Sequence, residues 1–168
     1  MNVIFLDIDE VMNSLAGTIR ARQIGVPSHC FQGFNPISVA LLKELVSITD
    51  AKIVLSSTWR MHYDTDEDCI EDFKKNMSLH HTWYDFPIIG RTPTYMQCRG
   101  EEIKSWLDLH YCMNYVIIDD SKDMLETQLN NFVHVDYREG FNFKNFAKCL
   151  KILGFADNHF ARMGGWTI

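Results

Sequence analysis

The fold of this chain is decided by a stretch near the N-terminus, Val3-Ile4-Phe5-Leu6-Asp7-Ile8-Asp9. Four apolar residues that end in a pair of carboxylates are typical of a buried strand that opens into a polar site. A second stretch repeats the pattern, Tyr115-Val116-Ile117-Ile118-Asp119-Asp120, and a third apolar run, Ile53-Val54-Leu55, ends in Ser56-Ser57. Parallel sheets hold their ligands at the carboxyl ends of the strands, so these runs predict three parallel strands that converge on one cation.

Strands and helices are predicted to alternate along the rest of the chain. The expected strands cover residues 2–6, 52–55, 86–90, 114–118 and 132–135. The expected helices cover residues 35–49, 65–75, 100–110, 122–129 and 142–153. Pro87 places the third strand at an edge of the sheet. This alternation predicts one α/β domain over residues 1–168, a Rossmann-like parallel sheet with helices on both faces.

Two segments lie outside this alternation. Residues 13–33 contain scattered Gly and Pro and are interpreted as a short cap-like loop, with room for a short helix. Residues 155–168 form a C-terminal tail. The first segment is too short for a full cap domain, so we expect a minimal cap or none.

Composition narrows the class of protein. Hydrophobic residues make up 46% of the 168 residues and charged residues 23%, which are ordinary values for a globular domain. No apolar run approaches the ~20 residues of a membrane span, and no basic segment precedes the first strand as in a signal peptide. We therefore expect a cytoplasmic protein. The five cysteines form no CxxC pair, which favours free thiols over disulfides or a zinc site.

The net charge of −6 opposes broad, nonspecific binding to nucleic acid. It leaves room for a nucleotide or a nucleic-acid end held locally by a few arginines. Nothing in the sequence predicts the oligomeric state.

The clustered carboxylates predict a magnesium site. Three or four acidic side chains at one edge of a sheet repel each other unless a cation lies between them. The donors are oxygen atoms with no His or Cys beside them, and this set favours Mg²⁺ over zinc.

These residues match a known family. Asp7-Ile8-Asp9-Glu10-Val11 resembles the DxDx(V/T) motif of the haloacid dehalogenase-like (HAD) superfamily of phosphatases, Ser56 fits its second motif, and Asp119-Asp120 fits its fourth. The strings Ser56-Ser57-Thr58-Trp59-Arg60 and Arg99-Gly100-Glu101-Glu102-Ile103 are similar to the HAD domains of RNA-repair proteins, and more distantly to polynucleotide 3′-phosphatase domains. The resemblance covers residues 3 to about 136.

The resemblance implies roles for the strand-end residues. Asp7 is expected to attack phosphorus and form an aspartyl-phosphate, and Asp9 to act as general acid and base. The expected metal ligands are Asp7, the backbone carbonyl of Asp9, and Asp120, with Asp119 close behind or in contact with a ligand. Ser56 is expected to donate a hydrogen bond to a phosphoryl oxygen, and Ser57 to help bind the substrate.

A cation is also expected from the family's third motif. Related phosphatases carry a Lys at the start of the helix before the fourth motif, where this chain has Gly100. Arg99 is the better replacement, and Lys104 is the alternative. Arg60 is predicted to bind a substrate phosphate through two parallel hydrogen bonds. Asp123 is a candidate to hydrogen-bond a metal-bound water.

The function predicted in this way is Mg²⁺-dependent phosphomonoester hydrolysis, on a nucleic-acid end or a nucleotide. A small-metabolite phosphatase or a protein phosphatase remains an alternative, because the same chemistry serves a different substrate. An inactive phosphate-binding module is another, since Glu10 stands where the family commonly has Gly. A phosphate-receiver domain fits less well, because such domains place the paired acids after the first strand.

Overall fold

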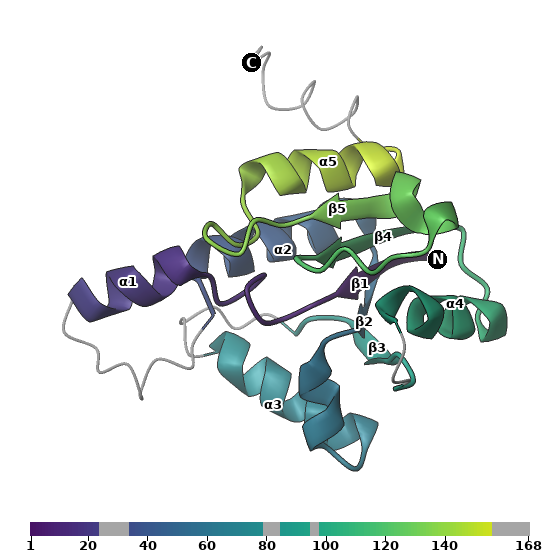
Figure 1. Cartoon of the computed structure of the whole chain (residues 1–168), viewed down its shortest axis with the longest axis horizontal. Coiled ribbons are helices and arrows are strands. Elements are labelled where there is room, and N and C mark those ends of the chain that lie inside the picture. Colours follow the sequence, from purple (N-terminus) through teal and green to yellow (C-terminus); the bar gives the residue numbers. More distant parts are fainter. Residues whose placement is uncertain (24–33, 79–84, 95–97, 156–168) are drawn as a thin grey trace.

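The computed structural model describes residues 1–23, 34–78, 85–94 and 98–155. Its sheet contains β1 (Asn2–Leu6), β2 (Lys52–Leu55), β3 (Ile88–Arg91), β4 (Asn114–Asp119) and β5 (Phe132–His134). The strand order is β3-β2-β1-β4-β5, and every neighbouring pair is parallel (Figure 1). The predicted Rossmann-like α/β fold is confirmed, and the third strand, which begins directly after Pro87, lies at an edge of the sheet as predicted.

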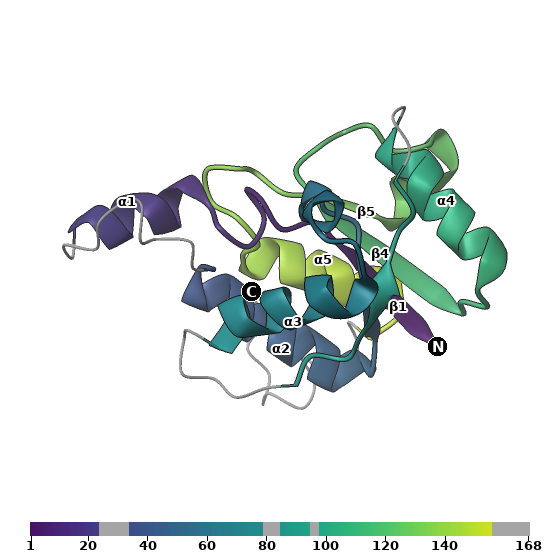
Figure 2. The same ribbon diagram turned by 90° about the horizontal axis from the view of Figure 1, so that it is seen from below.

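Helices cover both faces of the sheet. They are α1 (Leu15–Gln23), α2 (Pro36–Thr49), α3 (Asp66–Ser78), α4 (Arg99–Leu109) and α5 (Phe143–Leu153), with short 3₁₀ turns η1 (Thr58–His62) and η2 (Glu126–Asn131). Figure 2 shows α4 on the opposite side of the sheet from α2, α3 and α5. The caps agree with the sequence: the Asn35 and Asn142 side chains accept hydrogen bonds at the starts of α2 and α5, and Gly154 ends α5 with φ +83°.

The alternation of side chains along the strands divides the core into two parts. Ile4 and Leu6 of β1 belong to the core that includes α2 and α5, whereas Val3 and Phe5 belong to the smaller core beneath α4. The ring centroids of Phe5 and Trp106 of α4 are 5.4 Å apart in an edge-to-face contact. The odd-numbered residues of β1 therefore point toward α4, and the next odd position is Asp7.

The predicted helix over residues 122–129 is wrong. Residues 121–125 have no regular structure, and only η2 follows. This segment packs against the first turn of α4, and its polar groups form hydrogen bonds with that turn. The Asp123 carbonyl accepts the N–H of Gly100 (3.2 Å), and the Gln128 amide donates to the Gly100 carbonyl (2.8 Å).

Two expected segments are covered only in part. Of residues 13–33, the structure describes α1, which extends away from the sheet (Figure 1), and residues 24–33 lie outside the described part. Of the tail, residues 156–168 lie outside it. In the described part no separate cap domain accompanies the sheet, and none of the described helices is long and apolar enough to cross a membrane.

The close approach of α4 to residues 121–128 gives a stability prediction. A Cβ atom at Gly100 would lie 2.5 Å from the backbone nitrogen of Leu125 and 2.7 Å from Oε1 of Gln128. We expect Gly100→Ala to lower the free energy of unfolding by about 1–3 kcal/mol, because one of these groups must move. Urea denaturation measures the change.

Gly17→Ala is the matched control. Its Cβ would meet neighbours at ordinary distances of 3.7 Å, and it lies within α1. A neutral or slightly stabilising effect is expected there, since Ala is the better helix former. Equal losses for the two variants would contradict the account of the α4 contact.

Candidate active site

The register of the sheet brings three predicted residues to one level. Leu6 of β1 pairs with Leu55 of β2 and with Ile118 of β4. The next residue on each strand is therefore Asp7, Ser56 or Asp119. The Asp7 N–H donates to the Ile118 carbonyl and the Ser56 N–H to the Leu6 carbonyl, both at 3.0 Å, so the strand pairing continues to this level.

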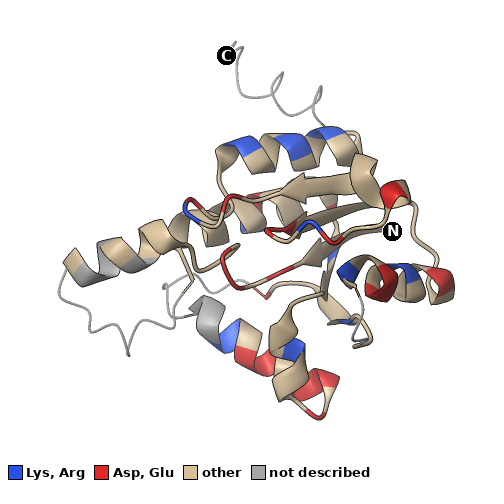
Figure 3. Cartoon of the chain, in the orientation of Figure 1, with Lys and Arg blue, Asp and Glu red and all other residues tan. Residues whose placement is uncertain are grey.

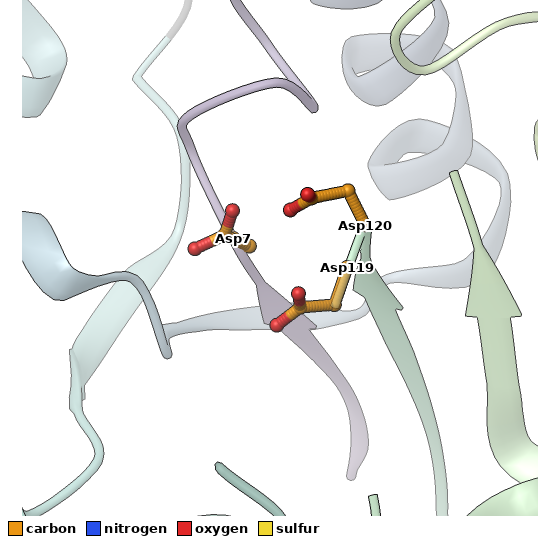
Figure 4. Close-up of side chains that lie close together, drawn as sticks. All are labelled: Asp7, Asp119 and Asp120. Atoms are coloured by element: carbon orange, nitrogen blue, oxygen red, sulfur yellow. The ribbon is translucent and has the colours of Figure 1, made fainter. Parts of the chain in front are cut away.

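Three carboxylates meet at this edge. Asp7, Asp119 and Asp120 each offer an oxygen, and these oxygens lie within 4.8 Å of one another. Figure 4 shows the Asp119 and Asp120 side chains pointing from the end of β4 toward the end of β1, where Asp7 lies. Asp7 is 4% exposed and Asp119 fully buried. Figure 3 shows the acidic residues along the chain that follows β1 and β4.

Asp9 lies beyond this group. The chain turns after β1, because the N–H groups of Val11 and Met12 both donate to the Ile8 carbonyl. The Asp9 carboxylate accepts a hydrogen bond from the Asn13 amide at 2.8 Å. Its side chain is not among the three clustered carboxylates, so a metal contact through the Asp9 carbonyl stays a prediction.

Glu10 occupies the strained position of this turn. Its φ is +62°, in the left-handed region that favours glycine, which is the residue the family commonly has there. Its carboxyl lies beside Asp120. The pKa of Asp120 is raised, first by burial and then by the hydrogen bond with Glu10 and its charge. Glu10 thus adds a fourth acidic group at the mouth of the site.

Arg99 is the cation that faces the carboxylates. Its Nη1 lies 3.0 Å from Oδ1 of Asp7 and 3.2 Å from Oδ2 of Asp119, and it also donates to the Ser56 carbonyl. Arg99 is the first residue of α4, the helix that covers the face toward which Asp7 points. The structure brings Arg99 to the place predicted for the third-motif cation.

Lys104 is not brought to the site. It lies one turn further along α4, where its ammonium pairs with Asp108 and its side chain is 58% exposed. The helical spacing of five residues turns it away from Arg99 and toward solvent.

Arg60 has a different role from the predicted phosphate contact. Its side chain is 2% exposed, and its five N–H groups all have partners inside the protein. They donate to the Ser56, Ser57, Thr92 and Pro93 carbonyls and to the Glu102 carboxylate. None remains for a substrate, so Arg60 holds the loops after β2 and β3 in place.

The two serines after β2 are fully buried. Ser57 caps η1 by accepting the Trp59 N–H at 3.3 Å, and its hydrogen bond to Asp7 favours the ionised carboxylate. The Ser56 hydroxyl has no hydrogen-bond partner in the described part of the chain. A buried hydroxyl without a partner is costly, so it is a donor available to a bound group.

Burial governs the protonation of the acidic cluster. Burial and the charge of Asp7 raise the pKa of Asp119 to about 8, although Arg99 opposes the shift. The pKa of Asp7 is also raised, by burial, against the lowering effect of Arg99. The single positive charge of Arg99 is therefore not enough to keep all three carboxylates, Asp119 included, ionised at neutral pH.

The donor set fits a hard divalent cation. The three carboxylates supply only oxygen, and Oδ2 of Asp119, apart from its ion pair with Arg99, accepts no hydrogen bond from any described residue. Mg²⁺ takes such oxygen ligands and would offset the repulsion that raises these pKa values.

Two residues have structural roles that the sequence did not predict. Asp123 accepts the Arg99 N–H on Oδ2 at 2.9 Å and the Ser121 hydroxyl on Oδ1 at 2.7 Å, so it caps α4 from a distant segment. Glu102, in the acidic first turn of α4, is 5% exposed and lies against both Arg60 and Arg99. The contact between Arg99 and Glu102 could have been predicted from the sequence, because a spacing of three residues places both side chains on one face of a helix.

Comparison with known families settles the relationship. A family model described as the HAD domain in Swiss Army Knife RNA repair proteins matches residues 3–146. The chain belongs to this family. The matched range contains β1 to β5 and every site residue named above. HAD domains are generally phosphatase-type hydrolases and typically use Mg²⁺. No curated protein and no solved structure matched the chain.

The raised pKa of Asp119 predicts a pH-dependent stability. Because the folded pKa of about 8 exceeds the ordinary value of 3.8, the folded state binds the extra proton between these values. Stability is therefore lost as the pH rises through this range. We expect metal-free Asp119→Asn to have a higher melting temperature than the wild type at pH 8, with a smaller difference at pH 5.

Asp123→Ala is the matched comparison, because Asp123 lies in the segment that follows Asp119 and its pKa is shifted in the opposite direction. Burial alone would raise the pKa of Asp123, but hydrogen bonds from Arg99 and Ser121 lower it below its ordinary value. Loss of this cap is expected to destabilise the protein by about 1 kcal/mol. Thermal unfolding followed by circular dichroism measures both variants. A lower melting temperature for Asp119→Asn at pH 8 would contradict the assigned electrostatics.

Proposed function

We propose that this protein hydrolyses phosphomonoesters in a Mg²⁺-dependent reaction through an aspartyl-phosphate on Asp7. The observation that supports this most strongly is the meeting of Asp7, Asp119 and Asp120 beside Arg99 at one edge of the sheet. Membership of the HAD family makes phosphatase-type chemistry the expected use of such a site.

Asp7 is the proposed nucleophile. Its carboxylate attacks phosphorus, the bond from phosphorus to the leaving oxygen breaks, and water later hydrolyses the acyl phosphate to return free Asp7. The Ser57 hydrogen bond and the Arg99 ion pair favour the ionised form of Asp7 that this attack requires.

The phosphoryl oxygens would be held by this chain's own donors. Arg99 is positioned to neutralise charge beside Asp7, and the partnerless Ser56 hydroxyl supplies a neutral donor at the same level. Mg²⁺ bound by Asp7, Asp119, Asp120 and the Asp9 carbonyl would supply the remaining positive charge for the phosphoryl group.

Asp9 is the proposed general acid and base. It would protonate the leaving oxygen and later take a proton from the attacking water. The Asn13 amide holds the Asp9 carboxylate in place through a hydrogen bond to Oδ1. Asp9 lies in the turn that begins at Ile8, directly after the nucleophile Asp7.

A phosphorylated nucleic-acid end is the proposed substrate. The family occurs in RNA-repair proteins, where removal of a terminal phosphate would prepare an end for further reaction. In the described part of the chain no cap domain covers the site, and this leaves room for a polymer. The net charge of −6 restricts the binding to a local contact at the terminus.

Phosphate release tests this function. The panel contains RNA and DNA oligonucleotides with a 3′- or 5′-terminal phosphate, the corresponding mononucleotides and an aryl phosphate, each with and without Mg²⁺. We expect Mg²⁺-dependent release, fastest from an oligonucleotide end. Asp7→Asn should reduce it to background, and Asp9→Asn should lower kcat about 10²–10⁴-fold.

Lys104→Gln is the control, because it removes a charge from α4 outside the site and should leave release unchanged. Near-wild-type hydrolysis by Asp7→Asn would contradict the covalent mechanism. A preference for mononucleotides or the aryl phosphate would contradict the proposed substrate. No release from any member of the panel would favour an inactive phosphate-binding module.

A further inference from the structure

A second ion pair lies buried behind the acidic cluster. Arg60 of η1 donates through Nη2 to Oε2 of Glu102 on α4, and their side chains are only 2% and 7% exposed. Burying two charges to this degree carries a large desolvation penalty, and burying one charge without its partner would destabilise the protein further. Neither residue takes part in the proposed reaction.

Arg60 anchors this pair to the backbone around the site. Its Nε donates to the Thr92 carbonyl at 3.1 Å and its Nη1 to the Ser56 carbonyl at 2.6 Å. These carbonyls follow β3 and β2, the two strands that lie on one side of β1 in the sheet. Glu102 is thereby held at a fixed place relative to the strand ends.

Glu102 also faces the cation of the site. The Glu102 Oε2 atom lies 3.9 Å from Nε of Arg99, on the same face of α4 and three residues along. The Nη1 atom of Arg99 contacts Asp7 and Asp119. The Ser56 carbonyl accepts from Nη1 of both arginines, so the two guanidinium groups share one backbone oxygen.

We propose that Glu102, anchored by Arg60, is a positioning residue that holds the Arg99 guanidinium between Asp7 and Asp119. This inference rests on the proposed function, because it assigns Arg99 to phosphoryl chemistry. Glu102 does not touch the reacting atoms. It fixes one edge of the Arg99 guanidinium so that Nη1 faces the nucleophile, and a free arginine side chain would sample several rotamers instead.

A double-mutant cycle in kcat tests the proposal. Glu102→Gln keeps the size and removes the charge that faces Arg99. We expect it to lower kcat about ten- to a hundredfold with little change in KM, as for a misplaced catalytic group. In an Arg99→Gln background, Glu102→Gln should have no further effect on kcat, because nothing remains to be positioned. The aryl phosphate serves as substrate.

Glu101→Gln is the matched control, since it removes an exposed carboxylate from the same helical turn. It should leave kcat unchanged in both backgrounds. Arg60→Lys provides a second route if Glu102→Gln does not fold. It keeps the charge but loses the fork of N–H donors, and its loss of kcat should also vanish in the Arg99→Gln background.

Equal losses of kcat from Glu102→Gln with and without Arg99 would overturn the proposal, because a merely structural role gives additive effects. Absence of turnover in the wild type would contradict the proposed function without deciding whether Glu102 positions Arg99. The same cycle is then measured as affinity for inorganic phosphate by calorimetry, where loss of the Glu102→Gln effect without Arg99 still supports the positioning role. A wild type that neither turns over substrate nor binds phosphate would overturn both.

Discussion

The site depends on the ion pairs of Arg99 with Asp7 and Asp119. Parallel pairing puts two carboxylates at the same level of adjacent strands and a third directly after them, and burial makes their mutual repulsion strong. Arg99 is the counter-charge supplied by the chain itself. Its placement explains why α4 must start at one point, since a shift by one residue would turn the guanidinium by about 100° around the helix.

Several contacts fix the residue at which α4 begins. Gly100 allows the backbone of residues 121–128 to approach the first turn of α4, and Asp123 caps the Arg99 N–H from the same segment. On the other side Glu102 is tied by Arg60 to the loops after β2 and β3. The segment that follows Asp119 and Asp120 therefore also fixes the cation, so that acids and counter-charge are positioned together.

Side-chain alternation connects the core to the site. Val3 and Phe5 face α4 and pack on its apolar side, and the next residue on that face is Asp7. The same reasoning on β4 leads from Ile117 to Asp119. The hydrophobic contacts that align β1, β4 and α4 thus determine which carboxylates meet Arg99, and a change of register by one residue would turn Asp7 to the opposite face.

The sequence predicted most of what local patterns encode. The strands, four of the predicted helices and the strand-end residues Asp7, Ser56, Asp119 and Asp120 follow from apolar runs, caps and their polar endings. The 122–129 helix was predicted wrongly, because its propensity is overridden by packing on α4. The role of Arg60 was missed for a related reason. The local sequence around Arg60 is polar and predicts an exposed side chain. Arg60 is buried with Glu102 only because the loops after β2 and β3 pack against α4 in the folded protein.

A titration with Mn²⁺, followed by electron paramagnetic resonance, tests the central claim most directly. Mn²⁺ shares the preference of Mg²⁺ for hard oxygen ligands and reports binding without turnover. The account predicts one bound ion per wild-type chain and a loss of at least about tenfold in affinity for Asp120→Asn, a change expected of a lost ligand. Lys104→Gln should bind as the wild type does. Absence of a bound ion in the wild type, or equal affinity in Asp120→Asn, would contradict the account.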